Sequence, residues 1–157
     1  VDVLFNMAHR SQFEVCQPAL SHDSYFSWWV TLQSPAFQVR FTNFVECMAP
    51  VFSIRSLNVM HNELAKAKSG CGLDLIFSEF FDMSKHPLGI VDVAPFKHTK
   101  PVDLENGSFY KHLREHGVDS RKEIHDFMSR FQMTKKEVLT LGGVSVSQTM
   151  VMPPAKP

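Results

Sequence analysis

The spacing of apolar residues along the chain predicts several amphipathic helices. Apolar side chains three and four residues apart lie on one face of a helix. This spacing predicts one helix from Ala36 to Met48 and a second helix from Pro50 to Gly70, because Pro50 ends the first and suits the start of the next. The apolar positions that carry these two predictions are Phe37, Phe41, Phe44, Val45 and Met48, then Ile54, Leu57, Met60 and Leu64.

Shorter elements follow in the second half of the chain. Residues 73–81 form an apolar segment typical of a short helix or turn, and residues 87–101 contain three prolines, which indicates a connecting segment. A helix is expected within 106–117, between an asparagine cap and a glycine stop. Ser120 and Glu123 form a capping-box pattern at the start of a further amphipathic helix.

The last predicted helix begins at Thr134, which forms a second capping-box pattern with Glu137. Its apolar positions are interrupted by Gly142 and Gly143. Each glycine costs a helix roughly 1 kcal/mol relative to alanine, so the pair indicates that another backbone or a flat ligand approaches closely. Alternation typical of a strand is weak except near 144–149, and the predicted fold class is mainly α.

The chain divides into two parts in this interpretation. Residues 1–35 carry prolines and no clear periodicity, so they are treated as an N-terminal extension that could serve as a docking segment. Residues 36–157 form the helical domain. The extension contains an aromatic cluster that suits either a core or a partner-facing patch: Tyr25, Phe26, Trp28 and Trp29.

Composition and charge exclude several classes of function. The chain has 157 residues, 44% of them hydrophobic, and its 16 basic residues balance its 16 acidic residues. This size and composition predict a single folded core. The balanced charge argues against a nucleic-acid partner, because such binding depends on phosphate neutralisation. No apolar stretch is long enough for a transmembrane helix, so we expect any membrane association to be indirect.

The cysteines and the chain ends bear on location. Cys16, Cys47 and Cys71 form neither a disulfide framework nor a zinc-like spacing, which favours a reducing compartment. Cys71, between two glycines, is a candidate reactive thiol, but an incidental cysteine is the favoured interpretation. The start at Val1 indicates a removed presequence or a trimmed start, and the proline-rich tail, 152–157, is expected to be held by a partner.

Three segments resemble a known family: Ala49 to Arg55, Gly72 to Phe81 with the following Leu88-Gly89, and Thr134 to Met150. The run from Thr134 to Met150, with its central Leu-Gly-Gly-Val, is similar to a helix of the class I haem peroxidases, the family of cytochrome c and ascorbate peroxidases. The run from Ala49 to Arg55 resembles the start of the distal helix in that family. Their order along the chain is preserved. The resemblance covers 36–157 and implies a partial haem-peroxidase-like helical domain, the N-terminal distal half of such an enzyme.

The resemblance also implies that the family's chemistry is lost. Peroxidases use a distal arginine and histidine to split peroxide and a later histidine to ligate iron. Arg55 occupies the arginine position, but Asn58 and Val59 stand where the family has tryptophan and the catalytic histidine, and His61 comes two residues late. If the last segment is aligned with the proximal helix instead, Ser145 replaces the iron ligand. This interpretation assigns no catalytic, cofactor-binding or metal-ligating residue.

Two alternatives retain a reaction. A working haem peroxidase could use an unusual ligand such as His61 or His98. A small zinc hydrolase could be built on His112, Glu115 and His116, which match the H-x-x-E-H pattern of two ligands one helical turn apart with a glutamate base. A solvated helix face explains that pattern more simply.

The sequence thus predicts a non-catalytic, peroxidase-derived protein without a cofactor. We expect it to be a structural accessory subunit of a larger membrane protein complex in an energy-converting organelle, respiratory or photosynthetic, with the mitochondrion favoured over the chloroplast. Its expected partners are other protein subunits of that complex.

Overall fold

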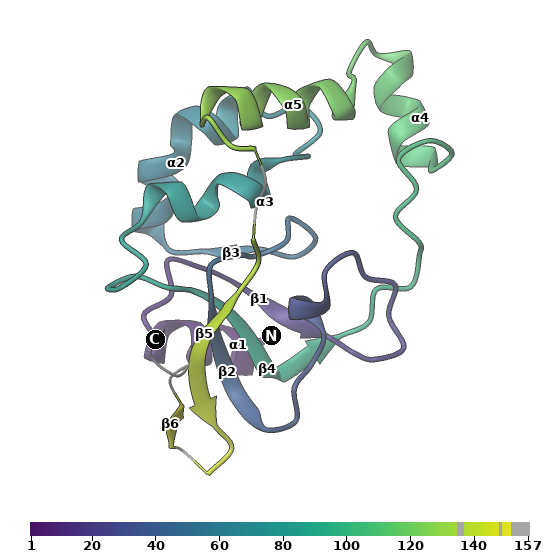
Figure 1. Cartoon of the computed structure of the whole chain (residues 1–157). Coiled ribbons are helices and arrows are strands. Elements are labelled where there is room, and N and C mark those ends of the chain that lie inside the picture. Colours follow the sequence, from purple (N-terminus) through teal and green to yellow (C-terminus); the bar gives the residue numbers. More distant parts are fainter. Residues whose placement is uncertain (135–136, 148, 152–157) are drawn as a thin grey trace.

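The computed structural model describes residues 1–134, 137–147 and 149–151 of the chain. The described part is a mixed six-stranded sheet with helices on both faces (Figure 1). The prediction of a mainly α fold, and with it of a partial haem-peroxidase-like helical domain, is therefore wrong. The elements in chain order are α1 (Asp2–Arg10), β1 (Val15–Leu20), η1 (Trp29–Thr31), β2 (Phe37–Thr42), β3 (Val51–Phe52), α2 (Ile54–Lys66), α3 (Leu73–Ile76), η2 (Phe77–Phe80), β4 (Leu88–Phe96), α4 (Ser108–Glu115), α5 (Ser120–Arg130), β5 (Thr140–Ser145) and β6 (Met150–Val151).

The sheet has the strand order β3-β1-β4-β2-β5-β6. β1 and β4 run parallel, and the other neighbouring strands run antiparallel. All six residues of β1 are buried, as are the first five of β4, so these two strands form the centre of the molecule. Their burial on both faces agrees with the rule that parallel strands are covered on each side.

The predicted helix from Ala36 to Met48 is wrong, because residues 37–42 form strand β2. Phe37 and Phe41 are four residues apart, a spacing that suits one face of a helix and one face of a strand equally well. In the sheet, Val39 and Phe41 pack toward α1, while Arg40 is buried on the opposite face. Hydrogen-bonded pairing with β4 on one side and β5 on the other makes this segment a strand rather than a helix.

The predicted connecting segment 87–101 is also wrong, since most of it is β4. Its prolines do not interrupt the buried part of the strand: Pro87 precedes it, and Pro95 lies near its end, where the register with β1 shifts. Gly89 is required by close packing, because a Cβ there would lie 2.3 Å from the Phe13 ring. A short, continuous apolar run is typical of a buried central strand.

The last predicted helix is wrong where the structure describes it, because β5 occupies 140–145. The expectation that a backbone approaches the glycine pair is confirmed for Gly143. A Cβ on Gly143 would lie 2.5 Å from the carbonyl oxygen of Val39 on the neighbouring strand. Lys135 and Lys136, at the predicted start of that helix, lie outside the described residues, as does the tail 152–157.

The helices predicted within 50–70, 106–117 and from Ser120 onward are confirmed as α2, α4 and α5, and the short apolar helix at 73–81 as α3 and η2. Three caps differ from the prediction. Gly107, not Asn106, is the N-cap residue of α4. Ser53 caps α2 by accepting a hydrogen bond from the Ser56 amide, after the short strand β3. Asp119, not Ser120, caps α5.

Two apolar clusters lie on opposite faces of the sheet. One joins α1 to Phe13, Cys16, Val39 and Val91. The other joins α2, α3, η2 and α5 to the ends of β1 and β4, and it includes Met60, Ile76, Phe77, Leu88 and Phe127. β1 belongs to the segment predicted as an extension, 1–35, yet it pairs with β4 of the segment 36–157. Among the described helices, none is long and apolar enough to cross a membrane.

Candidate functional site

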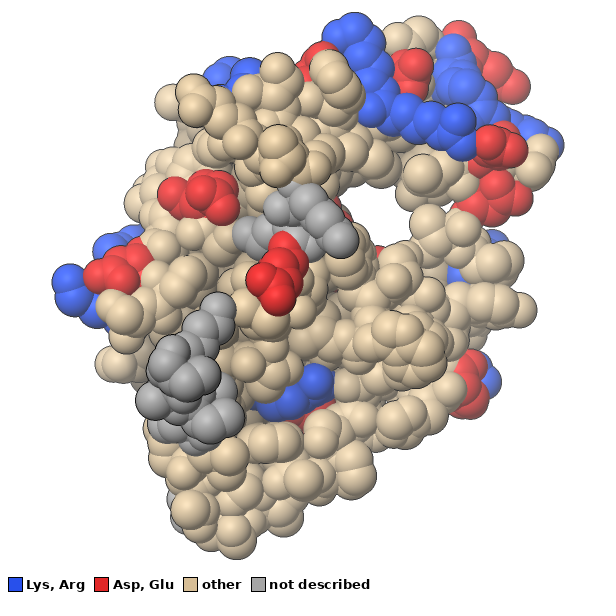
Figure 2. Space-filling view, viewed as in Figure 1, with Lys and Arg blue, Asp and Glu red and all other residues tan. Residues whose placement is uncertain are grey.

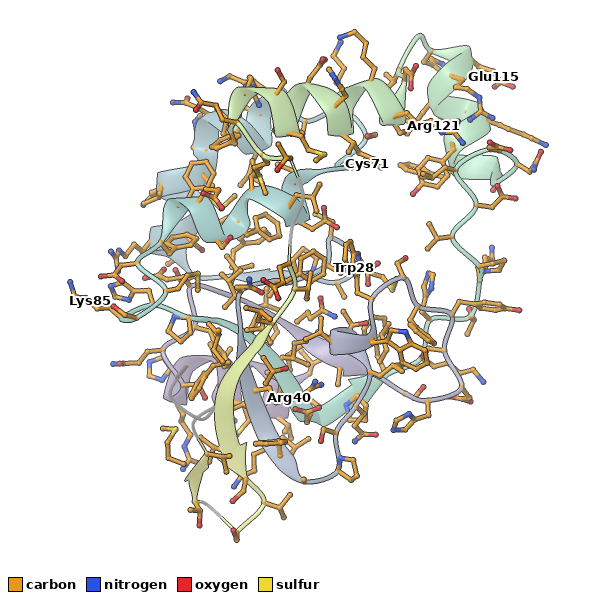
Figure 3. All side chains as sticks on the ribbon, in the orientation of Figure 1. Trp28, Arg40, Cys71, Lys85, Glu115 and Arg121 are labelled. Carbon is orange, nitrogen blue, oxygen red and sulfur yellow. The ribbon has the colours of Figure 1, made fainter. Side chains whose placement is uncertain are left out.

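A cleft of about 760 Å³ lies between the sheet and the helical layer. It is bounded by the loops after β1, β2 and β4, by the start of α3 and by α4 and α5. Figure 2 shows it opening as a gap below α4 and α5, with a mostly uncharged rim. Trp28 and Cys71 face this region in Figure 3. The described lining residues are Ser27, Trp28, Glu46, Cys47, Met48, Ser69, Gly70, Cys71, Gly72, Asp74, Leu75, His98, Val102, Leu104, Phe109, Tyr110, Ile124, Met128 and Thr134.

Glu46 is placed in this cleft by the loop that follows β2. Its backbone amide donates a hydrogen bond of 2.6 Å to Oε1 of Gln17, a fully buried side chain of β1. At the start of the loop, Thr42 Oγ1 donates to the carbonyl oxygen of Phe44 at 2.6 Å. These contacts hold Glu46 to the centre of the sheet, so its carboxyl group has a defined position at the cleft.

The carboxyl group of Glu46 is buried without full compensation. The residue is 7% exposed, and its Oε2 has no hydrogen-bond partner among the described residues. Burial raises the pKa of Glu46 to about 7; a hydrogen bond with the Ser27 side chain lowers it in part, and the charge of Asp74 raises it further. Because an unpaired buried charge is costly, Glu46 changes its protonation state near neutral pH.

Asp74 supplies a second carboxyl group to the same cleft. It lies in the first turn of α3, where burial raises its pKa to about 6. Hydrogen bonds from backbone amides, including those of Leu75 and Cys47, lower the pKa in part. Gly72 precedes the helix with φ +91°, and a Cβ there would lie 3.0 Å from Cα of Ile124. This close packing of the loop on α5 places Asp74 beside the cleft.

The loop that carries Cys71 is held by hydrogen bonds to the side chain of Glu123 on α5. The Glu123 carboxylate accepts hydrogen bonds from the backbone amides of Lys68, Ser69 and Gly70 at 3.0 to 3.1 Å. The thiol of Cys71 then lies 4.0 Å from the hydroxyl oxygen of Tyr110 on α4. Glu123, predicted as part of a capping box, therefore positions a wall of the cleft instead.

The Cys47 thiol and the Tyr110 phenol in the cleft stay neutral at physiological pH. Burial raises the pKa of Cys47, and the nearby carboxyl group of Asp74 adds to this effect. Burial together with the neighbouring Cys71 raises the pKa of Tyr110 to about 12. The thiolate is the reactive form of cysteine, so Cys47 is a poor nucleophile here and the two carboxyl groups are the titrating groups of interest.

Aromatic and aliphatic side chains make up the rest of the cleft wall. The Trp28 ring packs on the buried Phe44 with ring centroids 4.8 Å apart, and Phe109 packs edge-on against Tyr110 with centroids 5.2 Å apart. Among the lining residues that the structure describes, none is lysine or arginine. The described lining thus offers apolar contact and two carboxyl groups, without a lysine or arginine side chain.

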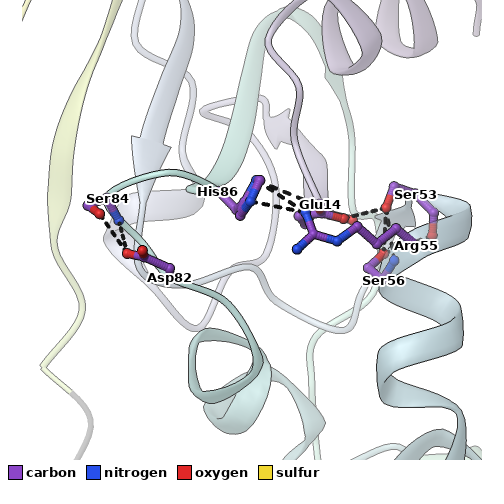
Figure 4. A network of polar contacts seen from close by, with 7 residues as sticks. All are labelled: Glu14, Ser53, Arg55, Ser56, Asp82, Ser84 and His86. Atoms are coloured by element: carbon purple, nitrogen blue, oxygen red, sulfur yellow. Dashed lines mark hydrogen bonds and ion pairs between the residues drawn. The ribbon is translucent and has the colours of Figure 1, made fainter.

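Arg55, predicted at a distal haem position, belongs to a different polar cluster (Figure 4). It donates to Glu14 Oε1 at 2.7 Å and lies 3.0 Å from Nε2 of His86. Glu14 also accepts from the Ser53 hydroxyl at 2.5 Å, and Ser56 donates to the Glu14 carbonyl oxygen. This cluster fastens the start of α2 to β1 and gives Arg55 a structural role.

The remaining predicted ligands are scattered. Val59 and His61 lie on exposed parts of α2, and Ser145 ends strand β5. His98 alone lines the cleft, where its Nδ1 lies 3.2 Å from the carbonyl oxygen of Tyr25. These positions do not converge on one haem-sized site.

The H-x-x-E-H pattern lies on α4. The His112 and His116 rings have centroids 4.3 Å apart on the exposed surface of the helix, and His116 Nδ1 lies 2.9 Å from the His112 carbonyl oxygen. No group of three or more histidine, cysteine, aspartate or glutamate residues in the described ranges could hold a metal ion.

The aromatic cluster of the first segment divides between two environments. Trp28 lines the cleft, while Trp29 is 78% exposed and packs against Phe26. Trp28 thus packs against the core residue Phe44, and the partner-facing role of the exposed members stays a prediction.

Sequence reasoning missed Glu46 and Asp74. Their signal was a single carboxyl group inside an apolar run, Phe-Val-Glu-Cys-Met around Glu46 and Gly-Leu-Asp-Leu-Ile around Asp74. Such a residue is rarely fully buried unless it is paired or functional. No family model, curated protein or solved structure matches this chain.

Proposed function

We propose that this protein binds a small molecule in the cleft and that Glu46 exchanges a proton with it. The observation that carries the proposal is the buried carboxyl group of Glu46, which borders the cleft and leaves Oε2 without a partner. Nearly all buried polar atoms in folded proteins have partners, so an exception at a concave site points to a role in function.

Proton transfer is the chemistry for which this site is equipped. A general acid or base works best when its pKa lies near the working pH. Glu46 and Asp74, with pKa values of about 7 and about 6, both meet this condition. The protonated form of one can coexist with the ionised form of the other, which allows one group to donate a proton while the other accepts one.

The shape of the cleft supports a small ligand rather than a polymer. Its volume of about 760 Å³ lies within the range of ligand pockets, and most of its wall is aromatic or aliphatic. The bound molecule would therefore have an apolar body and one polar group directed at Glu46.

The test is an NMR fragment screen on the whole chain, with the indole N–H of Trp28 as the reporter. Binders are expected to shift this signal and to lose affinity in Val102→Phe, which narrows the cleft at a half-exposed position. The matched control is Val146→Phe in the exposed turn that follows β5, away from the cleft lining. A screen without binders at Trp28, or binders equally affected by both variants, would contradict the proposal.

A second candidate is the accessory-subunit role expected from the sequence, without the peroxidase ancestry. It is favoured by apolar side chains that remain exposed, including Val3 and Phe5 on α1 and Trp29 at the start of η1. Exposed apolar patches are typical of protein contacts. Native mass measurement in extracts of the source tissue is the test: co-migration in a large assembly supports this role, and a free monomer argues against it. The organellar location stays a prediction.

A further inference from the structure

We infer that the ligand of the cleft is an organic amine, bound as an ammonium ion at Glu46 with its apolar body against Trp28 and the facing aromatic side chains. This inference rests on the proposed function, because it names the class of molecule that the same cleft accepts. It goes further by choosing among cationic, neutral and anionic ligands.

The charge of the cleft wall is the first argument. Two carboxyl groups, Glu46 and Asp74, line it, and its described lining contains neither lysine nor arginine. A phosphate or carboxylate ligand would therefore meet like charge, and no lysine or arginine of the described lining would compensate it. An ammonium group would meet opposite charge. Because binding sites often gain specificity by repelling competing ligands, the two carboxyl groups favour a cation over an anion.

The unpartnered oxygen is the second argument. Oε2 of Glu46 accepts no hydrogen bond within the described chain, although its side chain is more than nine-tenths buried. An ammonium group carries three donors and no acceptor, so it can satisfy this oxygen directly. Hydrogen bonds between ionised partners are about twice as strong as neutral ones, which makes the carboxylate the specificity-determining group.

The aromatic wall is the third argument. Trp28 is fixed by packing on Phe44, and Tyr110 and Phe109 lie on the opposite wall from α4. The faces of such rings attract cations and also bury the carbon skeleton of a ligand. Recognition of an amine by a carboxylate together with aromatic rings uses every unusual feature of this cleft.

Ligand binding is coupled to a proton in this arrangement. Below about pH 7 the Glu46 carboxyl group is largely protonated, since burial raises its pKa to about 7. A neutral amine that enters accepts the Glu46 proton directly and becomes the ammonium ion of the pair. An ammonium ion from solution forms the same ion pair, and the proton released when the carboxyl O–H bond breaks then passes to solvent. The other titratable groups that line the cleft are Asp74, Cys47, Cys71, Tyr110 and His98.

Three probes of matched shape test the inference: phenethylammonium, 2-phenylethanol and 3-phenylpropionate. Their dissociation constants are measured by calorimetry and by Trp28 fluorescence in a Trp29→Phe background, which removes the exposed second tryptophan. At about pH 8, where Glu46 is ionised, we expect the ammonium probe to bind about tenfold or more tightly than the alcohol, and the carboxylate probe more weakly than either.

The variants separate charge from shape. Glu46→Gln is expected to reduce the preference for the ammonium probe to about twofold or less while the alcohol still binds. Asp74→Asn is expected to weaken ammonium binding by a smaller factor. Calorimetry of the unmodified chain at about pH 6, in buffers of different ionisation enthalpy, should detect release of close to one proton per ammonium bound, and Glu46→Gln should abolish that release.

The possible outcomes distinguish the two proposals. Equal binding of the ammonium and alcohol probes, stronger binding of the carboxylate, or an unchanged preference in Glu46→Gln would overturn the amine inference and leave the proposed small-molecule site intact. Failure of all three probes together with an empty fragment screen would overturn both.

Discussion

The burial of Glu46 predicts an unusual effect on stability, in which removing the charge makes the protein more stable at alkaline pH. The ordinary pKa of this carboxyl group is 4.5, and burial raises it to about 7 in the folded chain. Folded Glu46 therefore holds its proton over a range in which the unfolded chain has released it. Stability falls as pH rises through this range and levels off above about pH 7.

The magnitude follows from the difference between the two pKa values. A rise in the pKa from 4.5 to about 7 lowers the free energy of unfolding by about 3 kcal/mol once Glu46 is ionised in both the folded and the unfolded chain. Glu46→Gln removes this penalty but leaves an amide with its own unsatisfied groups, a cost that does not depend on pH. The quantity to measure is therefore the change in the stability difference with pH.

Urea unfolding of both proteins at about pH 5 and about pH 8 measures this quantity. We expect the stability of Glu46→Gln relative to the unmodified chain to rise by about 2 to 3 kcal/mol between these values. The matched control is Glu115→Gln on the exposed surface of α4, for which no comparable rise is expected. If the free energies of unfolding of Glu46→Gln and the unmodified chain differ by the same amount at both pH values, burial does not raise the pKa of Glu46, and the prediction is refuted.

Three further predictions concern the elements that position the cleft. Arg40→Met should cost about 3 to 5 kcal/mol in chemical unfolding, because it leaves buried Asp92 without the partner that binds it at 2.9 Å; a loss under about 1 kcal/mol would contradict this. Gly143→Ala should lower the free energy of unfolding by about 1 to 3 kcal/mol, because its Cβ would lie 2.5 Å from the Val39 carbonyl oxygen, and an unchanged melting temperature would refute that contact. Glu123→Gln should speed amide hydrogen exchange at 68–70 by about tenfold while exchange in β1 and β4 stays the same; equal exchange in both proteins would show that the carboxylate does not hold this loop.

The helices were predictable because their signals are local. The spacing of Met60 and Leu64 and the glycine stop at Gly70 lie within a few residues of α2, so the helix is encoded where it forms. Strands β2 and β4 depend on partners far along the chain, as in the pairing of Val39 with Val91. Because Phe37 and Phe41 fit either period, the segment alone could not decide, and the resemblance to helical peroxidases favoured the wrong choice.

The cleft was less predictable than the fold. The candidate residues Cys71 and His98 do lie in it, but the proposed chemistry rests on Glu46 and Asp74, which also line the cleft and are far apart in sequence. Neither belongs to a motif. Their importance comes from burial, which raises the pKa of each carboxyl group, and burial is a property of the surroundings rather than of the residue.

The order of residues thus specified the helices and the glycine turns, because these follow from interactions between near neighbours, and the balanced charge follows from composition alone. The strand pairing, the burial of Glu46 and the joining of two carboxyl groups with an aromatic wall arose only when β1, β4 and α3 packed together. Desolvation depends on everything that excludes water from a group, so a carboxyl group that looks ordinary in the sequence has a raised pKa in the folded protein.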